Sequence, residues 1–150
     1  MKADLNEPLD FLADKSFAIV LSSLTMHYIK DWNPLLKEFN RVLQEGGYLI
    51  FSVHHPFMDF TYFNCDNYFA LELLEDEWST DKGKIKVNFY HRPLIQIISP
   101  VVHNGFIIEE ILEPMPTEKF RDVRPDAYIK LTKRPQFLFV RARKIANIAK

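Results

Sequence analysis

Residues 17–53, FAIVLSSLTMHYIKDWNPLLKEFNRVLQEGGYLIFSV, decide the fold class of this 150-residue chain. They hold two apolar runs, 17–21 and 48–53, that do not alternate with polar residues. Such runs are typical of strands that are covered on both faces of a parallel sheet. Between them, apolar residues recur at the spacing of one helix face; they are Leu35, Leu36, Phe39, Val42 and Leu43. Strand, crossover helix and strand predict a right-handed βαβ unit.

The ends of the crossover helix are also marked in the sequence. Asn33 can accept hydrogen bonds from first-turn amides as an N-cap, and Pro34 suits the first helical position, where no N–H is needed. Gly46 and Gly47 can supply the positive φ of a helix C-cap. We therefore expect the helix to begin at Pro34 and to stop at the glycines.

The remainder of the chain continues the α/β pattern. Residues 93–102 carry an apolar stripe that predicts a helix, kinked or shortened by Pro100. The runs 106–113 and 136–143 predict two more strands, with room for one short helix near 127–133. The sequence thus predicts one α/β domain over 1–150, an open sheet of about four strands.

Composition excludes several classes of protein. The chain has 19 Lys and Arg against 20 Asp and Glu, and 47% of its residues are hydrophobic, so it can bury a core. No stretch approaches the roughly 18 consecutive apolar residues of a membrane helix, and the first residues lack the pattern of a secretory signal. The single cysteine, Cys65, cannot form an internal disulfide, which fits a cytoplasmic location. We expect no membrane partner.

Two distributions are uneven. Residues 119–150 carry 10 basic and 2 acidic side chains, which would suit a nucleic-acid-binding tail, although a strand end and a solvated face explain the same pattern and are favoured. The segment 57–92 contains 9 of the 21 aromatic residues, which indicates an apolar structure there.

In open α/β sheets, ligands bind beyond the carboxyl ends of parallel strands, here residues 22–23 and 54–55. The histidines and Cys65 show no metal-ligand spacing, so we expect no metal site. There is also no glycine-rich dinucleotide motif and no phosphate loop.

Several segments together resemble the class I S-adenosylmethionine-dependent methyltransferases. They are Asp4-Leu5-x-x-Pro8-Leu9, residues 17–32, Leu43-x-x-Gly46-Gly47-x-Leu49-Ile50-Phe51-Ser52, residues 104–108 and residues 134–143. The resemblance implies a partial Rossmann-like sheet with helices on its faces, in which 17–21 and 48–53 are the family's fourth and fifth strands. The last two strands would form its closing antiparallel hairpin.

The resemblance also implies a cofactor, S-adenosylmethionine, and residues that hold it. Asp4 and Leu5 match the position that holds the adenine, and Ser22 and His27 match the loop that lines the methionine end. For Asp4 the alternative is a solvated acid near the terminus, and for His27 a half-buried packing residue.

The aromatic segment 57–92 lies where this family often places a cap over its substrate. By that resemblance Tyr62, Trp78, His91 and Arg92 are candidate substrate contacts, and His55 is a candidate base. Arg92 would favour an anionic substrate. The alternative is a small aromatic core under a long loop.

The family's first strand and glycine-rich turn precede the part that this chain resembles. The resemblance therefore implies the C-terminal part of an enzyme that methylates a small molecule, and the chain alone should bind S-adenosylmethionine weakly. Either a missing N-terminal segment or a second chain, such as another copy in a homo-oligomer, would supply the first strand and the glycine-rich turn.

Two alternatives stay open. One is a non-catalytic interaction module or half of a split enzyme that pairs through its open sheet edge. The other, less favoured, is a nucleic-acid-binding domain.

Overall fold

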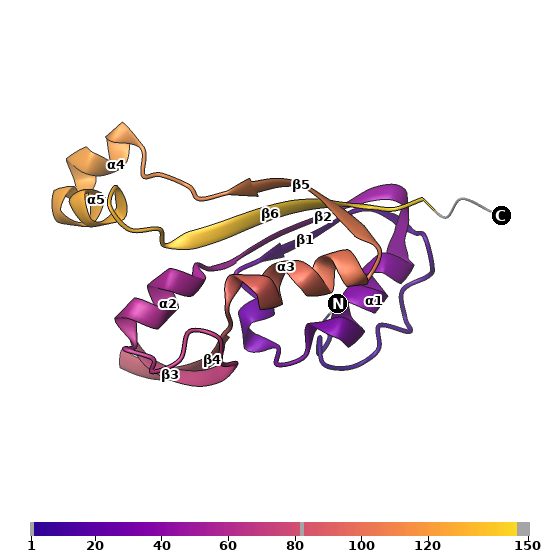
Figure 1. Cartoon of the computed structure of the whole chain (residues 1–150), viewed down its shortest axis with the longest axis horizontal. Helices are drawn as coiled ribbons and strands as arrows, with labels where there is room; N and C mark the ends of the chain where they lie inside the picture. Colours follow the sequence, from indigo (N-terminus) through magenta and orange to yellow (C-terminus); the bar gives the residue numbers. More distant parts are fainter. Residues whose placement is uncertain (1, 82, 147–150) are drawn as a thin grey trace.

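The computed structural model describes residues 2–81 and 83–146, which form a four-stranded sheet and a separate two-stranded sheet (Figure 1). In chain order the elements are β1 (Phe17–Ser23), the 3-10 turn η1 (Met26–Tyr28), α1 (Trp32–Val42), β2 (Leu43–His54), α2 (Pro56–Tyr62), β3 (Glu72–Thr80), β4 (Gly83–His91), α3 (Leu94–His103), β5 (Phe106–Leu112), α4 (Glu118–Val123), α5 (Pro125–Leu131) and β6 (Phe137–Lys144). No helix in these ranges is long and apolar enough to span a bilayer.

The predicted βαβ unit is confirmed. β1 pairs in parallel with β2, with Ile19 opposite Tyr48 and Leu21 opposite Ile50. β6 lies antiparallel between β2 and β5, so the larger sheet has the order β1-β2-β6-β5. The fold class is therefore the predicted α/β sheet with a closing antiparallel hairpin.

The ends of α1 differ from those predicted. Asp31, not Asn33, is the N-cap, because its carboxylate accepts a hydrogen bond from the Asn33 amide at 2.9 Å. The helix ends at Val42, and β2 starts at Leu43, whose side chain is buried. The glycine pair therefore lies inside β2, where Gly46 has a φ of 73°. The extended backbone of Leu43, with a ψ of 140°, thus ends the helix before the glycines are reached.

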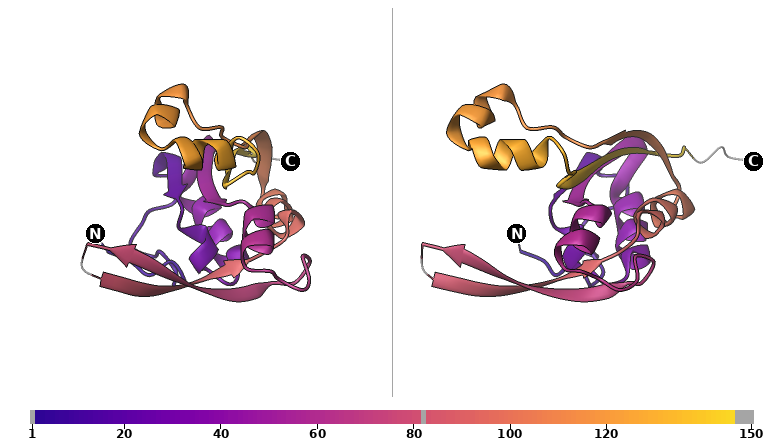
Figure 2. Two further views of the ribbon diagram at one scale, coloured as in Figure 1. Left: turned by 90° about the vertical axis from the view of Figure 1, so that its left-hand side faces the viewer. Right: turned by 60° about the vertical axis from the view of Figure 1, so that its left-hand side comes forward.

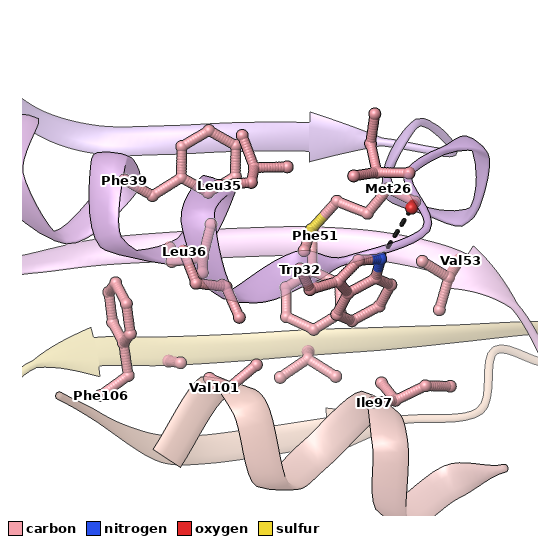
Figure 3. Packing of buried hydrophobic residues seen from close by; sticks show 14 of the residues in the cluster. Met26, Trp32, Leu35, Leu36, Phe39, Phe51, Val53, Ile97, Val101 and Phe106 are labelled. Atoms are coloured by element: carbon pink, nitrogen blue, oxygen red, sulfur yellow. Dashed lines mark hydrogen bonds between the residues drawn. The ribbon is translucent and has the colours of Figure 1, made fainter. Parts of the chain in front are cut away.

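The main core lies between the larger sheet and the two helices α1 and α3 (Figure 3). Trp32 starts α1 beneath η1, and its indole N–H donates to the Met26 carbonyl at 2.8 Å. From α3, Ile97 and Val101 are buried against the sheet. The helix runs through Pro100 to His103, so the proline does not shorten it.

The aromatic segment 57–92 folds as α2 followed by the β3–β4 hairpin, which the sequence did not predict. Cys65, Leu74 and Phe89 are buried together there, with Phe60 and Phe63 packed against them. These residues form a small aromatic core, the structure that we gave as the alternative to a substrate cap for this segment. Further along, Pro125 starts a second short helix, so two helices, α4 and α5, replace the one predicted near 127–133.

Within residues 2–81 and 83–146, helices cover the larger sheet on one face only, in contrast to the expected strands covered on both faces. Val20, which faces α1 and α3, packs against the main core. The side chains that alternate with it on β1 are exposed: Phe17 by 40%, Ile19 by 54% and Leu21 by 71%. β1 is also an edge strand, because β2 is its one strand partner among the described residues.

Candidate functional site

A cavity of about 810 Å³ opens beyond the carboxyl end of β2. Its walls come from four parts of the chain: the end of the larger sheet, α2, the β3–β4 hairpin and the segment from α5 to the start of β6. Figures 1 and 2 show α5 and the hairpin on opposite sides of this end of the sheet. The cavity therefore lies where the parallel strands of an α/β sheet direct a ligand.

His54, the last residue of β2, is a histidine in the cavity wall. Its Nδ1 lies 3.3 Å from Oδ1 of Asp59, which is buried in α2. The two atoms are within ion-pair distance but are not aligned as a hydrogen bond. Such pairs often tighten only when substrate is bound. The sequence placed a ligand site at residues 54–55, but the candidate base selected there was His55 and not His54.

His55, the predicted base, does not line the cavity. Its ring is buried, its Nδ1 accepts a hydrogen bond from the Phe57 amide, and its Nε2 lies 2.8 Å from Glu113 Oε1. The residue thus caps α2 and links it to the segment after β5. Adjacent residues of a strand point to opposite sides, so the two histidines are separated by the pleat.

Of the four predicted substrate contacts, Tyr62 and Trp78 line the cavity. His91 is fully buried, and its Nε2 lies 3.0 Å from the Tyr68 carbonyl oxygen. Arg92 is buried as well, and burial lowers its pKa to about 10.

The Arg92 guanidinium has partners within the fold. Its Nη2 donates to the Ile29 carbonyl at 2.6 Å, and its central carbon lies 4.3 Å from the centre of the Trp32 ring. Its side chain therefore supports the loop after β1 and does not face the large cavity.

A second, water-sized space of about 10 Å³ lies beside the first and is lined in part by His27, His54, Asp59 and Arg92. The His27 ring stacks on His54 with centroids 4.3 Å apart. Burial, followed by the charges of His54 and Arg92, lowers the pKa of His27 to about 3. His27 is therefore neutral at neutral pH. Neither of its ring nitrogens has a hydrogen-bond partner within the described ranges.

The predicted cofactor residues lie in two places. Asp4 is exposed on the N-terminal segment and accepts hydrogen bonds from the Asn6 amide and side chain, which lower the pKa of its carboxyl. Leu5 packs against the main core. Ser22 is buried at the end of β1, and its Oγ has no hydrogen-bond partner among the residues described. An exposed carboxylate and unpartnered buried polar atoms fit a polar ligand such as S-adenosylmethionine.

Three of the ten basic residues of the segment 119–150 lie in β6. Arg141 and Arg143 form ion pairs with Glu110 and Glu109 of β5. Lys144 is buried and donates to backbone carbonyls, among them that of Leu43. These contacts favour the strand-end interpretation of the positive charge.

Comparison with known proteins agrees with this geometry. Residues 1–51 match the sequence profile of a methyltransferase domain. An uncharacterized protein of Haemophilus influenzae is 30% identical over 161 residues, which cover 93% of this chain and 58% of that protein.

Two solved structures are similar. A protein from Listeria monocytogenes assigned to the S-adenosylmethionine-dependent methyltransferases is 26% identical, with a TM-score of 0.76 over 89% of this chain and 64% of that one. An S-adenosylmethionine-dependent methyltransferase from Mesorhizobium loti is 24% identical, with a TM-score of 0.69 over 95% of this chain and 68% of that one, and it shares the fold.

The fold is therefore Rossmann-like, of the methyltransferase type. Residues 1–51 match a methyltransferase domain, and the chain is similar in fold to S-adenosylmethionine-dependent methyltransferases, the family that its sequence motifs resemble. It spans 58% of the Haemophilus relative and 64% of the Listeria chain.

Proposed function

We propose that this chain forms the C-terminal, substrate-binding part of an enzyme that transfers a methyl group from S-adenosylmethionine to a small molecule. The observation that carries the proposal is the large cavity at the carboxyl end of β2, with His54 in its wall. The unpartnered polar atoms of Ser22, near the end of the neighbouring strand β1, and of His27, in η1 after it, mark the side that we assign to the cofactor.

Bound S-adenosylmethionine supplies a methyl group on a positively charged sulfur. The protein's task is then to align the acceptor with that methyl group and to exclude water. The aromatic walls of the cavity suit this task because they bury an apolar acceptor body and can lie against a cation. Tyr62 and Trp78 are two of these walls.

We assign the role of base to His54, in place of His55. A ring nitrogen of His54 would accept the proton of an oxygen or nitrogen nucleophile in the cavity. Asp59, 3.3 Å from Nδ1, would orient the ring and stabilise its protonated form. His55 is already held by Phe57 and Glu113 and has no comparable access.

The test uses a version of the chain that is extended with the polypeptide encoded upstream. This version is incubated with S-adenosylmethionine and pools of small acceptors, and S-adenosylhomocysteine is measured by mass spectrometry. We expect His54→Asn to lower turnover by roughly 100-fold or more, and Asp59→Asn by a smaller factor. Glu113→Gln is the matched control, because it alters the ion pair of His55 and leaves the cavity wall intact. Equal activity of His54→Asn and the control would remove His54 from the mechanism.

We further propose that activity requires strands beyond those of this chain. The open edge of β1 and the greater length of the relatives support this. Calorimetric titration with S-adenosylmethionine should show weak binding by the 150-residue chain and tighter binding by a version extended with the polypeptide encoded upstream. Negligible binding by both versions would count against the methyltransferase proposal.

The exposed apolar side chains of β1 favour a second candidate, an assembly module that pairs with another chain through this edge. This candidate does not exclude the first, since a second copy could supply the missing strands. For the nucleic-acid alternative, Arg141 and Arg143 offer little, because both are paired with glutamates of β5.

A further inference from the structure

We propose that the large cavity binds a small organic acid, in which an apolar body of about the size of an aromatic ring carries a carboxylate or a phosphate. Lys130 and Arg134 would hold the oxyanion. The inference deepens the proposed function, since it defines the class of acceptor. The predicted binding of an organic acid can be tested separately from methyl transfer.

The two cations lie on one wall of the cavity. Lys130 belongs to α5, and Arg134 lies in the connection from α5 to β6. Neither forms an ion pair with a carboxylate within residues 2–81 and 83–146, whereas Arg141 is paired with Glu110. The Lys130 ammonium lies 5.8 Å from the centre of the Tyr62 ring, close enough for a cation–π contact.

The acidic side chain in the lining, Asp76, is already engaged. Its Oδ2 accepts a hydrogen bond from the indole N–H of Trp78 at 2.9 Å, and its Oδ1 accepts one from the Glu77 amide at 2.8 Å. Asp76 therefore positions Trp78, and among the described residues it forms no ion pair with Lys130 or Arg134. Two cations without a carboxylate partner in a concave wall favour an anionic ligand, and arginine suits the two oxygens of a carboxylate or phosphate.

The other walls are apolar and large enough for a ligand body. The aromatic lining residues are Phe57, Tyr62, Phe63, Trp78, Phe89 and Phe137. A volume of about 810 Å³ falls in the range of pockets for small molecules. His54 belongs to the sheet end and the cations to the α5 wall, so the ligand would place its acid on α5 and its reacting group toward the sheet.

The chain offers an internal reporter for this site. It contains two tryptophans, so a ¹⁵N-labelled sample gives two indole signals. Trp78 is 38% exposed and lines the cavity, whereas Trp32 is 2% exposed and its N–H is bound to Met26. Binding in the cavity should shift the Trp78 signal and leave that of Trp32 in place.

The experiment titrates the chain with 3-phenylpropionate, phenyl phosphate and the uncharged 3-phenylpropanamide. We expect the acids to shift the Trp78 signal and the amide to bind about tenfold more weakly, since a charge-assisted hydrogen bond is lost. The stronger of the two acids identifies the preferred oxyanion. The double variant Lys130→Gln/Arg134→Gln should lose the preference for acids. Lys119→Gln/Lys133→Gln, which removes the same charge from outside the lining, should keep it.

Equal affinity for acid and amide, or unchanged acid binding by Lys130→Gln/Arg134→Gln, would overturn the inference. So would a Trp78 signal that no probe shifts at millimolar concentration. These outcomes are separate from those of the methyl-transfer assay, because the titration contains no S-adenosylmethionine. An extended version that binds the acids and methylates nothing would refute the proposed function alone. An enzyme that methylates only neutral acceptors would refute this inference alone.

Discussion

His27 is the residue whose burial has the clearest consequence for stability. Its ring is stacked on His54, faces the space that Asp59 and Arg92 also line, and has no hydrogen bond to either nitrogen among the residues described. Protonation would place a second positive charge beside Arg92. Burial and these neighbours therefore keep the ring neutral in the folded protein.

The stability of the chain should accordingly fall in acid. In the unfolded chain His27 takes up a proton below about pH 6.5, whereas in the folded chain it does so only near pH 3. The unfolded state binds more protons in this interval, so the free energy of unfolding contributed by His27 is fully present above pH 6.5. It is lost at up to about 1.4 kcal/mol per pH unit as the pH falls.

Urea unfolding between pH 7 and pH 4.5 measures this effect. His27→Phe keeps a stacking ring and removes the titration, so its stability should depend less steeply on pH than that of the original chain. The control His103→Gln removes an exposed histidine of α3. A pH profile of His27→Phe identical to the original would show that His27 does not contribute.

At the scale of elements, Gly47 sets the close approach of β1 and β2. A Cβ added there would lie 2.9 Å from the Gln44 carbonyl oxygen and 3.0 Å from that of Ala18. Both atoms belong to backbone and cannot rotate away as a flexible side chain could. The glycine is therefore required by strand packing, and not by a helix cap as its place in the sequence indicated.

Gly47→Ala should destabilise the fold by about 1–3 kcal/mol, the usual cost of overpacking a well-packed site. The midpoint of urea or thermal unfolding measures the change. The neighbouring substitution Gln44→Ala alters an exposed side chain of the same strand and should have little effect. Similar stability of the two variants would mean that β1 and β2 can separate at low cost.

At the scale of the whole molecule, the uncovered face of the sheet is the dominant feature. The larger sheet carries α1 and α3 on one side (Figures 1 and 2). Ile19 and Leu21, which alternate along β1 with the core-facing Val20, are exposed. An edge strand with apolar side chains recruits another strand or a covering layer. We therefore expect the 150-residue chain to associate.

Size-exclusion chromatography with light scattering tests this expectation. The chain should elute with a mass above its monomer mass of 17.7 kDa, and Ile19→Lys/Leu21→Lys should shift it toward monomer. Ile95→Lys is the control, because Ile95 is also exposed, by 58%, but lies on α3. A chain that is monomeric at high concentration, or a control that acts like the β1 variant, would contradict the expectation.

The amino-acid sequence by itself determined the local pattern of this protein. The apolar runs around the helix near Leu36 and Phe39 specified strand, helix and strand, because burial of a strand or of a helix face imposes a period that is legible along the chain. The family motifs follow the same order, so the α/β class was predictable, and the cavity lies at the strand end where the sequence predicts a ligand site.

The tertiary structure decided what depends on contacts between distant segments. The sequence shows His54 and His55 side by side, but only the packing of α2 and of the segment at Glu113 determines which ring reaches the cavity. Likewise, Arg92 is drawn to the Ile29 carbonyl, while Lys130 and Arg134 come to the cavity from the other end of the chain. The order of residues along the chain shows the period of a helix or strand. Which side chains then face the core or the cavity depends on how distant segments pack together.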